Sequence, residues 1–389
     1  AVGFSKRDYY RFGVKKLEEK FKVKILDFTK LFNPNYAKKS KEKNFFSKNY
    51  VNIKSLNHAK KLLNKIKPDY AFDQLTDGFK TEKLREHLSK NNIQIFIIQT
   101  GLTPIIKRKF LEKVHRIFFL IVEPSNLFKK ISKIFKNKLQ KFNELKNINI
   151  ILISGKKGEN SSIKNKELIY GHSLDFEKYL NFEKKKKIKT KTTTEYAVFL
   201  DQFLPHHPGA IMRGEHHKAT ENKYYPAIND FFDIFEQKTK LKVFIASHPR
   251  SNYSSNFNPF NKRKIIKGDT INLVKQSKLV FAHTSTSISF ALLYKKPIIF
   301  LTSDEIRVSY DDFRIDSLSR ELDCKLFNID DKNYKDTFNS FNDLKNFNNR
   351  FYKKFIDNYI KHPNSPNFSI WDNLINKLSN VSNIKEQKS

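Results

Sequence analysis

Short runs of continuous apolar residues alternate with longer amphipathic segments along most of the chain. Such runs predict strands buried on both faces, and the segments between them predict the helices that cover those faces. The apolar runs are 22–26, 70–72, 93–98, 148–153, 196–200, 242–247, 278–282, 297–301 and 325–329. Helical patterns include 8–21, 81–91 and 224–238. The alternation therefore predicts an α/β protein built on parallel sheets.

A basic tract divides this alternation into two halves. Residues 184–194 read KKKKIKTKTTT, which predicts an exposed linker. We predict two doubly wound, Rossmann-like domains facing each other across a cleft, 1–183 and 195–350, with C-terminal helices in 351–389 that pack back on the first domain. Residues 1–3 are too few for an opening strand, so we expect a strand upstream of the sequence or a different strand order.

The composition is strongly basic. The chain has 75 Lys and Arg against 40 Asp and Glu, a formal net charge of +35. This favours a polyanionic partner, namely nucleic acid, an anionic membrane face or an acidic glycan, although the abundant Lys, Asn, Phe and Ile also indicate compositional drift. The single cysteine, Cys324, excludes an internal disulfide and a cysteine-based zinc site, and indicates a cytosolic protein. The apolar run 117–122 is too short to span a membrane, and the N-terminus has no secretory apolar core.

Four consecutive hydroxyl residues follow the predicted strand 278–282. The stretch KLVFAHTSTSISFALLYKKPIIF contains His283 and then Thr284, Ser285, Thr286 and Ser287 at the expected start of a helix. A helix start offers unpaired amide groups and favours negative charge, so it can bind phosphate. An ordinary N-cap would explain one hydroxyl, but not four beside a histidine.

A second polar motif follows the predicted strand 242–247. His248, Pro249 and Arg250 come directly after it. A histidine can donate to a phosphate oxygen or protonate a leaving phosphate, and an arginine fork can pair with phosphate. The alternative is a simple turn, for which proline is suited. If strands 242–247 and 278–282 are adjacent and parallel, both loops leave the same sheet edge, and His248 and Ser285 converge on one phosphate.

The order of these two motifs resembles bacterial GT-B glycosyltransferases that build surface polysaccharides such as capsule or lipopolysaccharide. More narrowly, it resembles the sialyltransferase and Kdo-transferase groups, which use CMP-activated acidic sugars. The resemblance covers roughly residues 196–305 and places His248 and Pro249 on the His-Pro motif of these families, and Ser285 and Thr286 on their Ser-Ser or Ser-Thr motif. It implies that these residues hold the CMP phosphate in a C-terminal nucleotide-sugar-binding domain. CDP-glycerol-dependent glycerophosphotransferases share a similar pattern and remain an alternative, as do UDP-sugar enzymes of the GT-B type.

The resemblance implies transfer of an acidic sugar, a sialic-acid-like nonulosonate or Kdo, to a polysaccharide or lipid-linked glycan, without metal or another cofactor. Because both the glycan and the membrane are anionic, the charge predicts peripheral association with the cytoplasmic face of the membrane. The donor sugar, the acceptor, the linkage and the anomeric outcome stay open. A non-enzymatic nucleic-acid binder is the alternative from another class; the charge favours it, but the chain has no recognisable nucleic-acid motif.

A general base is expected from the first domain. The segment DQLTDGF places Asp77 after the predicted strand 70–72, where the resemblance implies an acidic pair before glycine and only one acid is present. Asp73 is the second choice, and a plain Asp-Gly turn is the alternative for Asp77. In GHSLDF, His172 and Asp175 either contact the acceptor or fix the crossing between domains.

Further polar residues follow the strand 196–200. Asp201 is expected to face the cleft and contribute to donor binding. The histidine pairs 206–207 and 216–217 suggest metal ligands, but no carboxylate has clear ligand spacing, so we expect loop histidines and no metal site.

Overall fold

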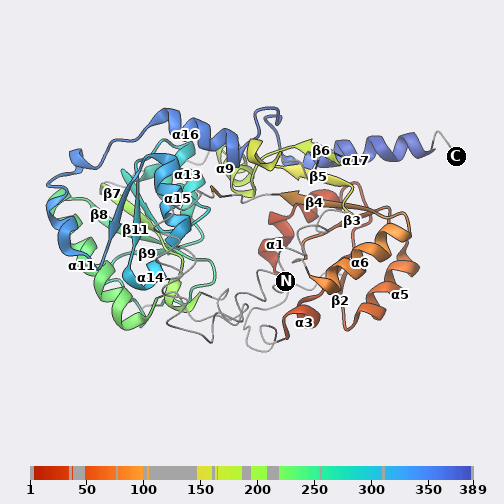
Figure 1. The fold of residues 1–389 in the computed structure, drawn as a ribbon, viewed down its shortest axis with the longest axis horizontal. Coiled ribbons are helices and arrows are strands. Elements are labelled where there is room, and N and C mark those ends of the chain that lie inside the picture. Colours follow the sequence, from red (N-terminus) through yellow and green to blue (C-terminus); the bar gives the residue numbers. More distant parts are fainter. Residues whose placement is uncertain are drawn as a thin grey trace, which may run out of the picture.

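The computed structural model contains two α/β units joined by segments that cross between them (Figure 1). The structure describes residues 4–34, 37, 49–75, 78–99, 103–104, 147–159, 163, 165–185, 194–207, 219–254, 256–308 and 312–386. The predicted linker is therefore described only at its two ends, and the apolar run 117–122 lies outside the described residues.

The C-terminal unit is built on one sheet of six parallel strands. The strands are β7 Tyr196–Leu200, β8 Lys242–Ser247, β9 Ile265–Lys267, β10 Leu279–Ala282, β11 Ile298–Thr302 and β12 Lys325–Asn328. Their spatial order is β12-β11-β10-β7-β8-β9. The chain thus winds outward from β7 in one direction to β9 and then in the other from β10 to β12. This reversal defines a doubly wound sheet and puts its switch point between β7 and β10.

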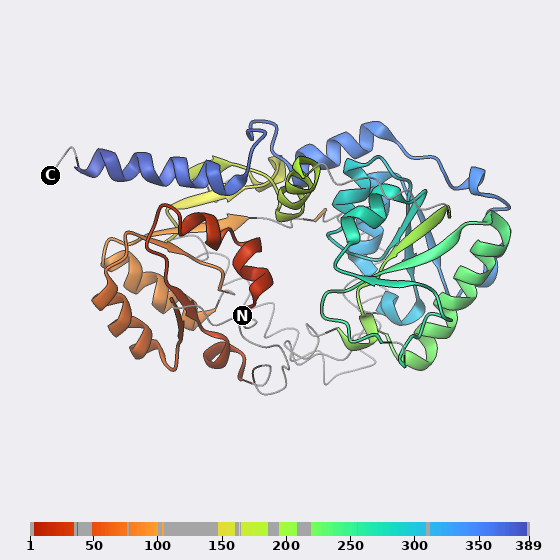
Figure 2. The same cartoon turned by 180° about the vertical axis from the view of Figure 1, so that it is seen from behind.

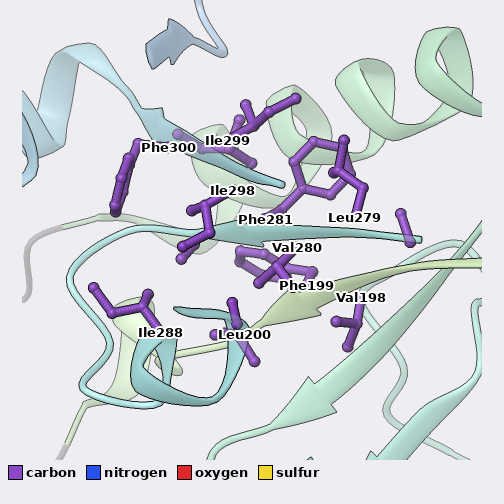
Figure 3. Close-up of a cluster of buried hydrophobic side chains, with 14 of the residues drawn as sticks. Val198, Phe199, Leu200, Leu279, Val280, Phe281, Ile288, Ile298, Ile299 and Phe300 are labelled. Atoms are coloured by element: carbon purple, nitrogen blue, oxygen red, sulfur yellow. The ribbon is translucent and has the colours of Figure 1, made fainter. Parts of the chain in front are cut away.

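The helices of this unit cover both faces of the sheet. They are α11 Glu221–Thr239, α12 Thr270–Gln276, α13 Ile288–Leu293, α14 Asp304–Val308, α15 Asp312–Leu322 and α16 Asn349–Phe355. The central strands are apolar at every position, as expected for a sheet covered on both sides. Figure 3 shows Val198, Phe199, Val280 and Phe281 on the neighbouring strands β7 and β10.

The N-terminal unit contains two parallel sheets among the described residues. One has β3 Tyr70–Phe72, β4 Gln94–Gln99, β5 Ile150–Ile153 and β6 Glu167–Tyr170 in chain order, and the other pairs β1 Ile25–Asp27 with β2 Tyr50–Asn52. The helices of this unit are α1 Lys6–Arg11, α2 Val14–Leu17, α3 Thr29–Phe32, α5 Leu56–Ile66 and α6 Phe79–Lys90. Helix α9, Leu174–Lys184, begins at this unit and then packs against α13 and the core of the C-terminal unit. The predicted class, α/β with parallel sheets in two Rossmann-like units, is confirmed.

The predicted helix over 8–21 is instead two short helices separated at Gly13. This residue has a φ of +63°, in the left-handed region that favours glycine. A Cβ atom built on it would lie 2.1 Å from the indole of Trp371, so only glycine fits against that ring. The break turns α2 toward the C-terminal helix.

The C-terminal helix α17, Ile370–Glu386, lies along the sheet of the N-terminal unit (Figures 1 and 2). Trp371 and Leu374 are buried in one apolar cluster with β4 and β5. The Lys16 ammonium lies 2.6 Å from an Asp372 carboxylate oxygen at the edge of this contact. The chain therefore ends on the unit in which it begins. Of the helices that the structure describes, none is both long and apolar enough to cross a membrane.

Two crossing segments connect the units and pair with each other. The Ser173 amide donates to the Ile360 carbonyl at 2.6 Å, and the His362 amide donates to the Gly171 carbonyl at 3.0 Å. Between α16 and this pairing, residues Ile356–Ile360 form a π-helical turn. Such turns often occur at functional or hinge positions.

Candidate functional site

Three loops leave the carboxyl ends of neighbouring strands at the switch point of the C-terminal sheet. They follow β8, β7 and β10, which lie side by side in that order. We expected the strands that lead to His248 and Ser285 to be adjacent. They are not, because β7 lies between β8 and β10. Two strand spacings separate the starts of these loops by about 10 Å.

The loop after β7 ties the other two loops together. The Asp201 carboxylate accepts the Phe203 amide at 2.8 Å and the His248 amide at 3.4 Å. The neighbouring Gln202 side chain accepts the Thr284 amide at 2.7 Å and donates to the Thr284 hydroxyl at 3.1 Å. Asp201 thus holds the His-Pro-Arg loop, and Gln202 holds the hydroxyl loop on the other side of β7.

Asp201 itself is buried, with 5% of its surface exposed. Burial raises the pKa of Asp201 to about 6, although hydrogen bonds from the Phe203 and His248 amides and from Tyr253 act in the opposite direction. The carboxylate therefore fixes the β7 loop and the His248 loop from inside the protein. This differs from the prediction that Asp201 faces the cleft and binds the donor.

His283 is a buried histidine, only 1% exposed. Its Nδ1 donates to the Leu301 carbonyl at 2.6 Å, and its Nε2 accepts the Tyr224 hydroxyl at 2.9 Å. Both ring nitrogens are engaged within the core of the unit. This differs from the prediction that His283 binds the donor, and we leave its side chain out of the proposed site.

His248 is half-buried at the carboxyl end of β8. Its Nδ1 accepts the Arg250 amide at 3.2 Å, so the neutral ring carries its proton on Nε2. Burial lowers the pKa of His248 to about 3, and positive charges on His207, Arg250, Arg7 and Lys267 lower it further. His248 is therefore a neutral hydrogen-bond donor. Pro249 beside it is exposed and shapes the turn.

The hydroxyl loop runs from Thr284 to the start of α13. The Ser285 hydroxyl accepts the Ser287 amide at 3.2 Å, while Thr286 is exposed. Ser287 occupies the N-cap position of α13 without capping it through its side chain. The Ser287 hydroxyl is therefore not explained by a role in capping the helix. Ser285 and Thr286 line a cavity.

That cavity has a volume of about 140 Å³ and is lined by both units. The C-terminal unit contributes the hydroxyl loop, together with α15 and the α16 region. The N-terminal side contributes Arg11 at the end of α1, Thr103, and Ser173 and Asp175 at the start of α9. Ser285 and Thr286 therefore lie opposite N-terminal residues, as expected for a ligand site between two units.

A second cavity, of about 400 Å³, lies between the ends of β8 and β9. Ser251, Tyr253, Arg263 and Lys267 are among the residues that line it. The Lys267 ammonium donates to the Ser251 carbonyl at 2.7 Å, which fixes the segment after His248. The His248 loop thus lies beside this cavity, and the hydroxyl loop lines the first one. The convergence of His248 and Ser285 on one phosphate stays a prediction.

Asp77, the predicted general base, lies outside the described residues. The second choice, Asp73, accepts the Arg85 Nε at 2.7 Å, and both side chains are nearly inaccessible to solvent. Asp73 is therefore committed to a buried ion pair. Asp175 is the N-terminal carboxylate that lines the interdomain cavity, where it lies 3.6 Å from the Lys178 ammonium.

His172 fixes the crossing between units. It is fully buried, and its Nε2 lies 2.9 Å from a Glu177 carboxylate oxygen, which also accepts the Ile370 amide at 3.0 Å. Burial acts to raise the pKa of Glu177, but hydrogen bonds from His172, Ile370 and Ser369 outweigh it and lower the pKa to about 2. Of the two roles open for His172, the structure favours fixing the crossing.

The histidine pairs have different outcomes. His206 forms an ion pair with Glu221, and the His207 ring lies 5.2 Å from the His248 ring. The pair 216–217 lies outside the described residues. Over the described ranges, no group of three or more His, Cys, Asp or Glu side chains is placed to hold a metal ion.

Comparison with solved structures finds distant similarities. UDP-GlcNAc 2-epimerase from Methanocaldococcus jannaschii is 14% identical over 95% of this chain and 95% of that one, with a TM-score of 0.47. S. aureus MnaA, solved with UDP, is 12% identical over 87% and 84%, with a TM-score of 0.43. MurG from Acinetobacter baumannii is 8% identical over 71% of this chain and 65% of MurG, with a TM-score of 0.35. No protein-family model and no curated protein sequence matches the chain.

Two residues of this site were not singled out from the sequence. Gln202 follows Asp201 directly, but its role depends on β10 lying beside β7, and strand order is not visible in a sequence. Arg11 belongs to a basic N-terminal stretch, KRDYYR, that gives no sign of which cation faces the cavity. The fold alone brings Arg11 opposite residues about 270 positions later (285 − 11 = 274).

Proposed function

We propose that this protein is a glycosyltransferase that moves an acidic sugar from a CMP donor to a polysaccharide or a lipid-linked glycan. The observation that carries the proposal is the joining of the His-Pro-Arg loop and the hydroxyl loop by Asp201 and Gln202. This junction lies at the switch point of a doubly wound sheet, where such sheets bind nucleotides.

The groups around the junction suit a phosphate. His248 Nε2 carries a proton to donate, and Ser285 and Thr286 offer hydroxyls beside the cavity. Arg250 and Arg7 are close enough to repel a proton from His248, so positive charge gathers here from both units. A bound phosphate would supply the missing negative charge and would stabilise these cations in return.

In the proposed reaction, the bond between the anomeric carbon and the phosphate oxygen breaks, and its electron pair leaves with CMP. Hydrogen bonds from His248 and the hydroxyl loop stabilise the departing phosphate. The acceptor hydroxyl forms the new bond to the anomeric carbon and gives its proton to a carboxylate. We propose Asp77 as this base if the reaction inverts the anomeric configuration. If the variant Asp77→Asn keeps its activity, Asp175 becomes the proposed base instead.

We propose that the reaction needs neither a metal ion nor another cofactor. Arginine side chains can neutralise a leaving phosphate as a divalent cation does in other enzymes, and a neutral histidine can donate a hydrogen bond to it. Activity should therefore persist in EDTA, and strict dependence on added Mg²⁺ or Mn²⁺ would contradict this part of the proposal.

Thermal protection by nucleotides tests the donor most directly. A ligand that binds only the folded protein raises its unfolding midpoint in proportion to the logarithm of its concentration. We expect protection by CMP and by CMP-activated acidic sugars, and release of CMP once a glycan acceptor is added. Protection by UDP alone would favour a UDP-sugar donor, and turnover with CDP-glycerol would favour a glycerophosphotransferase.

The net charge of +35 also fits the non-enzymatic alternative, a nucleic-acid binder. Such binding loses affinity steeply as salt rises, because it depends on counterion release. Tight binding of RNA or DNA at physiological salt, without protection by any nucleotide, would favour this alternative over the transferase.

A further inference from the structure

Arg11 lines the cavity between the two units, and its Nε has no hydrogen-bond partner among the described residues. It ends α1 and lines the cavity opposite Ser285 and Thr286. Its Nε is buried, and within the described part of the chain no hydrogen-bond acceptor satisfies it. A buried polar atom left unpaired costs free energy, and more so when it is charged. An anionic ligand in the cavity would give this guanidinium an acceptor that the described residues do not provide.

The rest of the cavity wall favours an anion as that ligand. Hydroxyl groups line it from both units: Thr103, Ser173, Thr284, Ser285, Thr286 and Ser289. The carboxylate of Asp175 is also in the wall, but the Lys178 ammonium lies 3.6 Å from it. Partial burial lowers the pKa of Lys178, and Asp175 raises it. Repulsion from Arg11 and Arg7 lowers the pKa of Lys178 again, so these three cations lie near one another.

We infer that Arg11 binds an anionic group of the donor, a carboxylate or a phosphate, from the side opposite the hydroxyl loop. The guanidinium fork matches the two oxygens of either group. The donor is thereby held by both units at once, with Arg11 on one side and Ser285 and Thr286 on the other. The choice of donor rests on the proposed function, whereas the anion site rests on the cavity alone.

A CMP-activated nonulosonate carries two anionic groups, the phosphate and a carboxylate on the anomeric carbon. If the His248 loop and the hydroxyl loop bind the phosphate, Arg11 is left to bind the carboxylate. The site would then prefer an acidic sugar over a neutral one, because a neutral sugar would leave the partly buried guanidinium without an anionic partner.

Calorimetric titration of the full chain with CMP and with CMP-N-acetylneuraminate tests this inference. Arg11→Gln is compared with Lys6→Gln, which removes an equal charge from the same helix away from the cavity. We expect Arg11→Gln to lose about tenfold or more in affinity for the CMP-sugar and little for CMP, while Lys6→Gln stays close to the unaltered protein. Equal losses for both ligands would identify the phosphate as the group that Arg11 binds.

If no cytidine nucleotide binds the unaltered protein, the proposed donor is wrong, and the same variants are compared with UDP and UDP-glucuronate. A selective loss in Arg11→Gln there upholds the anion site. Equal affinities of Arg11→Gln and Lys6→Gln for every ligand that binds, or no binding of any of the four, overturns it. A second measurement excludes a purely structural arginine: without ligand, the unfolding midpoint of Arg11→Gln should equal or exceed that of the unaltered protein.

Discussion

At the scale of single residues, the state of His248 decides how it can act. The neutral ring can donate from Nε2 but has no second proton to give a leaving group. Burial and the surrounding cations disfavour protonation of this histidine, and a bound phosphate would reduce the second effect by offsetting the positive charges. If the proposed donor binds here, His248 would act first as a hydrogen-bond donor to its phosphate, and as a general acid only if the bound nucleotide raises its pKa.

His248→Ala should lower the rate of sugar transfer by about a hundredfold or more, as loss of a positioned donor to developing charge typically does. Ser285→Ala should lower it less, because neighbouring hydroxyls and amides of the loop remain. Initial rates of CMP release measure both effects. Unfolding midpoints provide the control, and both variants should stay near the unaltered protein because both side chains border solvent.

The pKa of His248 also predicts how stability depends on pH. In the unfolded chain this histidine takes up a proton near 6.5, and in the folded protein not until about 3. Between these values the unfolded state binds more protons, so the free energy of unfolding falls as pH falls, by at most about 1.4 kcal/mol per pH unit.

Asp201 has the opposite effect between pH 6 and 3.8, because its folded form binds the proton first. The two contributions are separated by His248→Ala, measured by urea unfolding from pH 7 to 4. The unaltered protein should lose stability relative to the variant on acidification. Parallel pH curves for the two proteins would show that His248 titrates normally in the folded state.

At the scale of elements, the sequence predicts what depends on local pattern. Strands β7 and β8 begin and end where their apolar runs do, because these runs of five and six residues are bounded by polar segments. Strands β2 and β9 have three residues each, YVN and IIK, which is too short for a period to show. The helix predicted over 8–21 breaks at Gly13 because of contact with Trp371, a residue distant in sequence.

In the candidate site too, some features follow from local sequence pattern and others from contacts between distant residues. Its two motifs were visible as polar clusters after apolar strands, and the structure does place them at one sheet edge. That β7 lies between them, and that the His283 ring points into the core, follow from strand order and packing. A sequence gives the loop on which a polar residue lies, but not which of its neighbours turn inward.

Gln202 is the link through which the β7 loop holds the hydroxyl loop. Gln202→Ala removes its hydrogen bonds to the Thr284 amide and hydroxyl, so the loop loses its fixed position. We expect nucleotide affinity to fall by about tenfold, in line with the loss of one or two hydrogen bonds. Titration calorimetry measures this, and Gln276→Ala on α12 serves as the matched control. An unchanged affinity in Gln202→Ala would show that the loop holds its shape without the link.

At the scale of the whole molecule, α17 makes the N-terminal unit depend on the end of the chain. Trp371 is 2% exposed and packs against Gly13 and the sheet cluster. Trp371→Ala should lower the free energy of unfolding by about 3–5 kcal/mol. Lys377→Ala, which breaks a surface ion pair with Glu167, should cost about 1 kcal/mol or less. Denaturant unfolding measures both, and similar losses for the two variants would show that α17 is not part of the core.

The charge of the whole molecule leads to the last prediction, which concerns the membrane. A transferase that adds acidic sugars to a lipid-linked glycan works beside an anionic surface. Basic residues near such a surface contribute about 1 kcal/mol each, and this attraction weakens as salt shortens the Debye length. With 35 more cations than anions in the chain, a few of them facing the bilayer would suffice for reversible binding.

We therefore expect the protein to float with liposomes that contain phosphatidylserine and to be released as salt rises. Neutral phosphatidylcholine liposomes are the control and should not retain it. Binding that is equal on both liposomes would point to insertion of apolar side chains, and binding that ignores salt would exclude an electrostatic origin. If neither liposome retains the protein, the charge serves the acidic glycan or the donor instead. The anion site proposed at Arg11 is one place where such a ligand would bind.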